Sequence, residues 1–449
     1  MRILFISAFY PPHVIGGWEQ LVEELNDGLR RRGHTTHVLT STHGVAGAAQ
    51  AEDGVERTLL LESNLQFYQP AAMFSYRQRT QHNLDATRAT IEGFQPDVIF
   101  VHIMWNLSRG VPWQAEQLAR GRVVYYVADH WAYSPDPHEA YWRDPAGDPL
   151  RRTLKRLIAP LPLSVVRQDR KRFQLAFDRV LCVSAAIRQS MLDHLPELRP
   201  QRVEVVYNGI DLAAFPFQRR VNGGVQGGLR RGLRLLYAGS LVPHKGVHTA
   251  IGAMQELVRQ GAVVPGAEDA PQLTVVGSGR PDYEAALRKA VQESGLQECV
   301  HFAGRVPRDK MPACLAAHDV LVFPSEWPEP LARMMQEAMA SGAVVIGTVT
   351  GGSGELLVDG ETGLVFAPRD AAALAAQIRR LQAEPALVDR LAAAARQRVE
   401  EHFGFERMLD QVEGILVDTA DSAGGEPRDT ARPSNVLLSS PMPPSAVKS

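Results

Sequence analysis

The sequence HDVLVFPSEWPEPLARMMQEAMASGAVVIGTVTGG, residues 318–352, joins the pattern of a buried strand to that of a helix. The apolar run over residues 318–323 is typical of a buried parallel strand, and Pro324 ends it. From Leu331 onward apolar residues recur at helical spacing, and a second apolar run follows over residues 343–346. Strand, helix and strand in this order predict a doubly wound parallel sheet.

Two carboxylates of this stretch, Glu329 and Glu337, are eight positions apart. Glu329 falls just before or at the N-terminus of the predicted helix, where backbone N–H groups and the helix dipole favour a bound anion. Glu337 lies about two turns further along, where a carboxylate can accept hydrogen bonds from paired hydroxyl groups. A phosphate at the helix end with polyol groups on either side indicates a sugar nucleotide as the ligand.

The same alternation of strands and helices continues along most of the 449 residues and predicts an α/β protein with two such domains. Strand patterns occur at residues 2–9, 36–41, 96–102, 122–129 and 179–184, and again at 233–241, 272–279, 299–304, 318–325, 343–348 and 362–368. We expect a first domain over residues 1–205, a second over 206–400, and a C-terminal helix over 401–418 that packs back on the first. Residues 419–449 are rich in Pro, Ser, Gly and Ala and are expected to be disordered.

Composition narrows the class of protein. The formal net charge is −2, so nothing global indicates a nucleic-acid partner. The three cysteines lack metal-ligand spacing and are expected to be buried small apolar residues in a reducing compartment. No segment reads as a signal peptide or a membrane span, and the expected location is the cytoplasm, at most peripheral to the inner face of a membrane.

Further loop signals follow other predicted strands. Gly16 and Gly17 come after the first strand and would let backbone N–H groups approach a diphosphate, although the pair is also ordinary turn chemistry. Ser240 and Lys245 follow the first strand of the second half, where a lysine can bind a phosphate or can be a solvated surface residue. Each signal is weak alone, but their order along the chain is informative.

Taken together, these motifs resemble the retaining GT-B glycosyltransferases of glycosyltransferase family 4 over roughly residues 1–415. The resemblance is carried by the Gly-Gly loop, a Lys-Gly at the start of the second half, the paired glutamates of an ExFGxxxxE signature, a GGxxE loop and an NGxD turn, here Gly16, Gly17, Gly239, Lys245, Gly246, Glu329, Glu337, Gly351, Gly352, Glu355 and residues 207–211. The resemblance implies two Rossmann-like domains facing across a cleft, the first on the acceptor side and the second on the donor side.

The resemblance also implies an activity. The protein would transfer a sugar, with retention, from a nucleoside diphosphate sugar to a hydroxyl of a saccharide, lipid-linked or small-molecule acceptor, as in polysaccharide or glycolipid biosynthesis. Lys245 would neutralise the leaving diphosphate, helped by backbone N–H groups of residues 331–333 and of Gly17. Glu329 would hold hydroxyls of the donor sugar, and Glu337 would bind the ribose. Neither a metal nor a cofactor beyond the nucleotide sugar is implied, and the chain has no Asp-x-Asp pair.

The donor motif that the resemblance implies departs from the family pattern in two places. Ser240 occupies the position of a usual arginine, so Arg305 or Arg333 would have to supply that charge. Leu331 and Ala332 replace the usual Phe-Gly, and an alanine fits there only if its backbone φ is negative.

A third departure concerns the strand end YYVADHW. The family often has a histidine where this chain has Ala128, while Asp129 matches the following aspartate. His130 or His102 would then compensate in the acceptor or catalytic cleft, or either would be a hydrogen-bonded structural residue, the commoner role for histidine.

Residues 151–172 form a basic run in which leucine and isoleucine alternate with arginine and lysine. The pattern fits an amphipathic segment in contact with anionic lipid or a lipid diphosphate, and it equally fits a solvated helix face. Pro160 and Pro162 interrupt any long helix there.

Other functions for the same two-domain architecture are a catalytically impaired nucleotide-sugar-binding protein, which Ser240 and Ala128 would favour, and a nucleotide-sugar epimerase or a phosphorylase. An epimerase needs groups placed for elimination on the sugar ring, and a phosphorylase needs a cofactor lysine site; neither is visible in the sequence. The donor base, the sugar and the acceptor stay open at this point.

Overall fold

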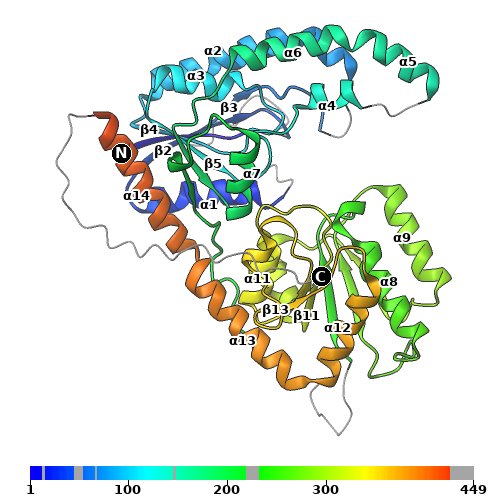
Figure 1. Cartoon of the computed structure of the whole chain (residues 1–449). Coiled ribbons are helices and arrows are strands. Elements are labelled where there is room, and N and C mark those ends of the chain that lie inside the picture. The colour runs from blue at the N-terminus through cyan, green and yellow to red at the C-terminus, as the bar shows by residue number, and fades with distance from the viewer. Residues whose placement is uncertain (13–15, 45–53, 66–67, 145–147, 219–231, 425–449) are drawn as a thin grey trace. The chain divides into compact units, whose positions relative to one another are not determined.

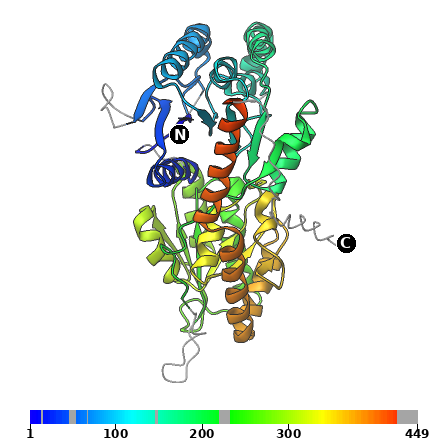
Figure 2. The same ribbon diagram turned by 90° about the vertical axis from the view of Figure 1, so that its left-hand side faces the viewer.

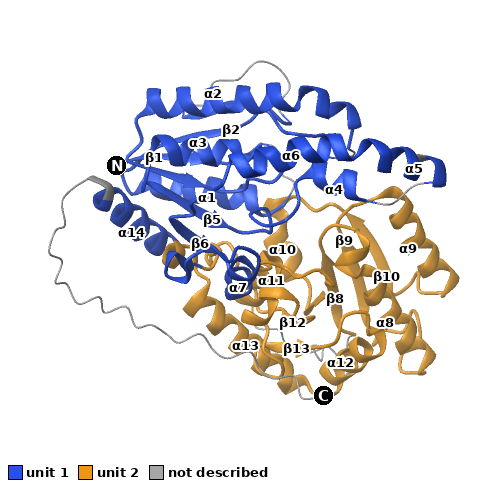
Figure 3. Cartoon of the chain, turned by 45° about the horizontal axis from the view of Figure 1, so that its top comes forward, with its two compact units in different colours: residues 1–206, 409–441 blue, residues 207–408, 442–449 orange. Residues whose placement is uncertain are grey.

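The computed structural model describes the chain except for residues 13–15, 45–53, 66–67, 145–147, 219–231 and 425–449. The described residues divide into two compact units (Figure 3): unit 1 has residues 1–206 and 409–424, and unit 2 has residues 207–408. Unit 2 therefore begins one residue later than the sequence predicts and ends at Met408 rather than at residue 400. None of the described helices is both long enough and apolar enough to cross a membrane.

Unit 1 is built on a parallel sheet that has seven strands in the described residues, in the order β3-β2-β1-β4-β5-β6-β7. These strands are β1 (Arg2–Ile6), β2 (Thr35–Ser41), β3 (Val55–Leu59), β4 (Val98–Val101), β5 (Val123–Val127), β6 (Arg179–Cys182) and β7 (Val203–Val205). Every residue of β4 and β5 is buried, as the unbroken apolar runs predict for the middle of a parallel sheet covered on both faces. The strand order reverses between β1 and β4, where ligands of such sheets commonly bind.

Helices cover both faces of this sheet, with α2 and α3 on one side and α1 on the other (Figure 1). They are α1 (Trp18–Arg31), α2 (Tyr76–Phe94), α3 (Gly110–Leu118), α4 (Pro137–Arg143), α5 (Pro149–Ile158), α6 (Pro160–Arg172), α7 (Ala185–His194) and α14 (Phe405–Gly424). Helix α1 buries Leu21, Val22, Leu25 and Leu29, the apolar face expected from the sequence, and Gly33 follows it in the left-handed conformation.

Unit 2 repeats the architecture with a parallel sheet of six strands in its described part, in the order β10-β9-β8-β11-β12-β13. The strands are β8 (Arg234–Ala238), β9 (Gln272–Val276), β10 (Val300–Gly304), β11 (Val320–Phe323), β12 (Val344–Gly347) and β13 (Gly363–Val365). The predicted α/β fold with two doubly wound parallel sheets is thus confirmed.

The helices of unit 2 are α8 (Val247–Arg259), α9 (Pro281–Glu293), α10 (Met311–Ala316), α11 (Arg333–Ala340), α12 (Ala371–Ala383) and α13 (Pro385–His402). One core cluster joins them to the sheet and includes Leu235, Met254 and Leu374. The NGxD turn is tied to α11, because Asn208 and Gln336 exchange hydrogen bonds of 2.9 and 2.8 Å through side chain and backbone. This pairing orients the helix that carries Glu337.

Helix α14 returns to unit 1 (Figures 1 and 2). Arg32 of unit 1 pairs with Asp410 at 2.7 Å and with Glu413 at 2.6 Å, and Arg179 donates to Thr419 at 3.3 Å. Because α14 continues to Gly424, the prediction of a disordered tail from residue 419 was wrong for its first six residues. The rest of that tail lies outside the described residues.

Candidate functional site

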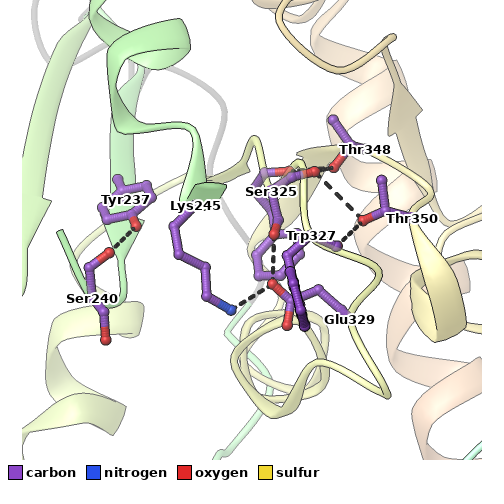
Figure 4. Close-up of polar contacts among 9 residues, drawn as sticks. Tyr237, Ser240, Lys245, Ser325, Trp327, Glu329, Thr348 and Thr350 are labelled. Carbon is purple, nitrogen blue, oxygen red and sulfur yellow. Dashed lines mark hydrogen bonds and ion pairs between the residues drawn. The ribbon is translucent and has the colours of Figure 1, made fainter. Parts of the chain in front are cut away.

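Glu329 and Lys245 form an ion pair at the carboxyl edge of the unit 2 sheet (Figure 4). Lys245 belongs to a short 3-10 turn, η3 (Pro243–Lys245), that follows β8, and Glu329 lies in the loop between β11 and α11. The Glu329 side chain is almost buried, and its Oε1 accepts from Lys245 Nζ at 2.6 Å and from Ser325 Oγ at 2.5 Å. The two groups that the sequence predicts to face the donor thus neutralise one another in this structure.

The loop that carries Glu329 is held by the glycine loop after β12. Gly352 N donates to Glu329 O at 2.7 Å, and Thr350 Oγ1 donates to Trp327 O at 2.6 Å (Figure 4). Gly351 has φ +59°, and a Cβ there would lie 2.4 Å from Glu329 O. Only glycine therefore allows the two loops to approach this closely, which gives the predicted GGxxE loop a structural role beside Glu329.

Glu337 lies on α11 and is 1% exposed. Its Oε1 is 2.6 Å from Arg308 and 3.8 Å from Arg333 Nε, whereas its buried Oε2 has no hydrogen-bond partner among the described residues. Arg308 lies in the 3-10 turn η4 (Arg308–Lys310) after β10. A buried carboxylate with one oxygen paired and the other unsatisfied is suited to accept hydrogen bonds from a bound hydroxyl.

Sequence reasoning named Arg305 as a source of positive charge and missed Arg308. Arg305 is exposed, while Arg308 contacts Glu337. Both arginines follow β10, and each is a basic residue just past a strand end, so the sequence signal is the same for the two. The turn between them decides which one reaches the Glu337 carboxylate.

Ser240, Leu331 and Ala332 lie near these pairs in the chain. The Ser240 carbonyl accepts a hydrogen bond from the Tyr237 hydroxyl at 2.9 Å (Figure 4). Ser240 itself is exposed. Leu331 is buried, and Ala332 precedes α11 with φ −80°. The condition set by the sequence, a negative φ at the alanine that replaces glycine, is therefore met.

In unit 1, Gly16 and Gly17 lead into α1. Gly16 N donates to the Glu19 carboxylate at 3.0 Å, and Gly17 is the N-cap residue of the helix with φ −86°. Their backbone N–H groups lie at a helix N-terminus, where an anion is favoured.

The histidine and aspartate positions of unit 1 differ in environment. His102 is 2% exposed, stacks against Phe5 and lies edge-on to Phe100; burial lowers its pKa to about 3, and its Nε2 has no hydrogen-bond partner among the described residues. His102 is therefore a neutral residue packed among aromatic rings of the core, and its predicted role in the acceptor or catalytic cleft stays a prediction.

Asp129 and His130 lie just past the end of β5. Burial raises the pKa of Asp129 to about 6, although its Oδ1 accepts from Trp131 N at 2.9 Å. His130 Nδ1 is 2.5 Å from the Tyr133 hydroxyl. A half-buried carboxyl whose pKa is raised, at a strand end, is a candidate functional group.

Among the described residues no group of three His, Cys, Asp or Glu side chains is placed to hold a metal ion. Cys182 and Cys299 are buried, and burial raises the pKa of Cys182 to about 12, which leaves this thiol unreactive.

Known proteins resemble both halves of the chain. A family model described as Glycosyltransferase Family 4 matches residues 15–214, and one described as Glycosyl transferases group 1 matches residues 230–398, which contain both ion pairs described above. A glycogen synthase of Mycobacterium tuberculosis is 31% identical over 427 residues, covering 90% of this chain and 92% of that protein. The chain belongs to glycosyltransferase family 4.

Solved structures agree with the fold of this glycosyltransferase. A sucrose-phosphate synthase from Thermosynechococcus elongatus superposes with a TM-score of 0.68 at 21% identity, covering 94% of this chain and 99% of that one. The Anabaena protein Alr3699/HepE, solved in complex with UDP and glucose, has a TM-score of 0.64 at 22% identity and covers 93% and 99%. The predicted GT-B fold is confirmed, and the glycosyltransferase carries the Lys245–Glu329 and Arg308–Glu337 pairs in its second unit.

Proposed function

We propose that this glycosyltransferase moves a sugar from a nucleoside diphosphate sugar to a hydroxyl of a saccharide, lipid-linked or small-molecule acceptor, with retention of the anomeric configuration and without a metal. The observation that carries the proposal is the presence of the Lys245–Glu329 and Arg308–Glu337 pairs on the loops and helix at the carboxyl edge of one sheet. A nucleoside diphosphate sugar has a charged diphosphate between a sugar and a ribose. The ammonium of Lys245 suits the diphosphate, and the carboxylates of Glu329 and Glu337 suit the hydroxyl groups on either side of it.

Each group has a role in the proposed reaction. Glu337 accepts hydrogen bonds from the ribose hydroxyls through its unsatisfied Oε2, and Glu329 accepts from hydroxyls of the donor sugar. When the donor binds, Lys245 exchanges part of its contact with Glu329 for the diphosphate. Its charge becomes more valuable as the bond from the anomeric carbon to the diphosphate oxygen breaks and that oxygen takes the electron pair.

The acceptor hydroxyl then attacks from the face that the diphosphate leaves, and its proton passes to the departing diphosphate oxygen. Attack on that face retains the configuration. Backbone N–H groups at the start of α11 add fixed dipoles toward the same charge.

One set of comparisons supports a nucleotide donor: HepE of Anabaena is described in complexes with UDP and with UDP-glucose. We infer a nucleoside diphosphate hexose as the donor.

The test is the release of nucleoside diphosphate from UDP-, ADP- and GDP-sugars in the presence of glucan, lipid-linked and small-molecule acceptors. The anomeric configuration of the product is read by NMR, with EDTA present in a parallel reaction. Transfer with an α-linked product from an α-linked donor, undiminished by EDTA, is expected. Tight donor binding without release for every acceptor would favour the impaired-binder alternative, and an inverted product would exclude retention.

We also propose that α5 and the start of α6 contact an anionic membrane surface. Helix α5 extends beyond the unit 1 sheet in Figure 1, and its residues are almost all exposed. Five large apolar side chains on this segment are 42–80% exposed: Leu150, Leu154, Leu157, Ile158 and Leu161. Exposed Arg152 and Arg156 lie among them, so the segment presents apolar area and positive charge together, which suits anionic lipid.

A further inference from the structure

A polar pocket lies beside the Lys245–Glu329 ion pair in unit 2. Its volume is about 360 Å³, near the small end of ligand pockets, and its lining residues are Pro243, His244, His248, Glu326 and Arg369. These residues come from the loops after β8, β11 and β13 and from the first turn of α8, so the pocket opens at the same edge of the sheet as Glu329. Neither Lys245 nor Glu329 lines it.

Glu326 is the centre of the polar network in this pocket. Its Oε2 accepts from Arg369 Nε at 2.5 Å, and its Oε1 lies 3.2 Å from His248 Nε2. Oε1 is buried but makes no hydrogen bond of acceptable geometry with any described residue. The other nitrogen of His248 is 2.9 Å from the Tyr283 hydroxyl. A buried carboxylate oxygen that its own neighbours do not satisfy needs a further donor.

Arg369 has a backbone conformation that its side chain does not favour. Its φ is +67°, in the left-handed region that glycine adopts without steric cost. The Arg369 side chain is 77% exposed, so its ion pair with Glu326 adds little stability in return. An unfavourable residue at a pocket wall, without a structural gain to offset it, indicates a role in binding.

The charge of the pocket indicates the class of ligand. The guanidinium of Arg369 and the carboxylate of Glu326 cancel, and burial together with the neighbouring Lys245 ammonium lowers the pKa of His244, which keeps that ring neutral at pH 7. Glu326 and Arg369 thus offer acceptors and donors whose charges balance, which suits a neutral polyhydroxyl compound. The ring of Trp327, 43% exposed, lies 5.6 Å from the His244 ring and offers an apolar face at the same place.

We propose that this pocket binds one neutral glycosyl unit of a saccharide acceptor. The proposal deepens the proposed function and rests on it. Glu326 and His248 accept from and donate to ring hydroxyls, Arg369 donates to them, and the indole of Trp327 covers a C–H face of the sugar. Glu326 lies three residues before Glu329, so the bound unit is held next to the group that grips the donor sugar.

Direct binding of soluble oligosaccharides tests the proposal without nucleotide sugar. The probes are α-1,4-, α-1,6- and β-1,4-linked gluco-oligosaccharides and α- and β-linked galacto- and manno-oligosaccharides, measured by isothermal titration calorimetry. Glu326→Gln and Arg369→Gly are each expected to weaken binding at least tenfold. Arg379→Ala, which removes an exposed arginine that contacts Gln260 on the same unit, is the matched control and is expected to bind like wild type.

The Arg369→Gly variant separates binding from folding. Because glycine relieves the left-handed backbone, its melting temperature is expected to equal or exceed that of wild type while its saccharide affinity falls. Unchanged affinity in both variants, or no binding of any oligosaccharide by wild type, would overturn the proposal. So would inorganic phosphate binding that Arg369→Gly abolishes without any saccharide effect. Donor turnover by wild type is measured separately, so that a failure of the proposed transferase reaction is distinguished from a failure of this subsite.

Discussion

Lys245 Nζ lies 2.6 Å from Glu329 Oε1, and the Glu329 side chain is almost buried. The pair places a positive group next to the expected position of a departing diphosphate while keeping it compensated before the donor arrives. A partly buried ion pair of this kind contributes little net stability, because the desolvation of the two groups offsets their attraction. Its value lies in the fixed position of the two side chains.

Lys245→Ala is expected to lower kcat by roughly 10²–10³-fold with a smaller change in KM for the donor, since the lost charge is needed most as the diphosphate departs. Steady-state release of nucleoside diphosphate measures both constants. Lys310→Ala removes an exposed lysine paired with Asp309 and serves as control. A lysine variant with a wild-type turnover rate would eliminate the assigned role.

Glu337→Gln is expected to raise KM for the donor about tenfold and leave kcat at saturating donor nearly unchanged. The amide keeps the shape of the side chain but weakens charge-assisted hydrogen bonds to hydroxyl groups. Calorimetric titration with nucleoside diphosphate gives the affinity directly, and Glu293→Gln, in an exposed pair with Lys289, is the control. An unchanged affinity combined with a reduced kcat would contradict the ribose assignment.

Gly351→Ala and Gly360→Ala form a matched pair of substitutions. Both glycines have positive φ, +59° and +70°, so each alanine costs roughly 1–2 kcal/mol of backbone strain. Only the alanine at 351 would also meet backbone, with Glu329 O at 2.4 Å, whereas nothing lies within 4 Å at 360. Chemical denaturation should therefore show the larger loss of stability for Gly351→Ala. Equal losses would show that the two loops adjust to one another freely.

Asp129→Asn is expected to stabilise the protein at neutral and higher pH. The folded-state pKa is raised from 3.8 to about 6 by burial, so the folded state binds the proton more tightly and loses stability as pH rises through this range. Asparagine carries no such penalty. The gain in unfolding free energy should be near zero below pH 4 and reach roughly 2–3 kcal/mol above pH 7.

Urea denaturation of both proteins at pH 4 and pH 8 checks the Asp129 prediction. A pH-independent difference would show that Asp129 is not desolvated in the folded state. A loss of transferase activity in the stabilised variant would mark Asp129 as a functional carboxylate whose retention costs stability.

Leu157→Glu is expected to weaken binding to vesicles of phosphatidylcholine with phosphatidylglycerol roughly tenfold, because a mostly exposed leucine of α5 would no longer enter the lipid. Phe74→Glu changes an apolar residue outside that segment that is even more exposed than Leu157, and this variant should bind like wild type. Co-sedimentation at low and high salt separates apolar from electrostatic contributions. Equal binding of wild type to neutral and anionic vesicles would contradict the role of the basic residues.

The amino-acid sequence by itself determined the α/β class, the two parallel sheets and the family. Apolar runs such as residues 98–101 can be buried only in the middle of a covered sheet, and the spacing of Glu329 and Glu337 needs only the helix that joins them. Both patterns are local, because each depends only on residues that are close together in the chain. The end of the ordered C-terminal segment escaped the same reading, because residues 419–424 are helical although their composition resembles that of a disordered chain.

Only the tertiary structure decided which charges meet. Lys245 and Glu329 are 84 positions apart, and Arg308 rather than Arg305 reaches Glu337, because turns after β8 and β10 orient their side chains in ways that composition does not encode. The burial of His102 in an aromatic core and the left-handed backbone of Arg369 beside Glu326 likewise depend on packing between distant segments. Local sequence sets the elements, whereas the electrostatics of the site arise from contacts that exist only once the sheet has formed.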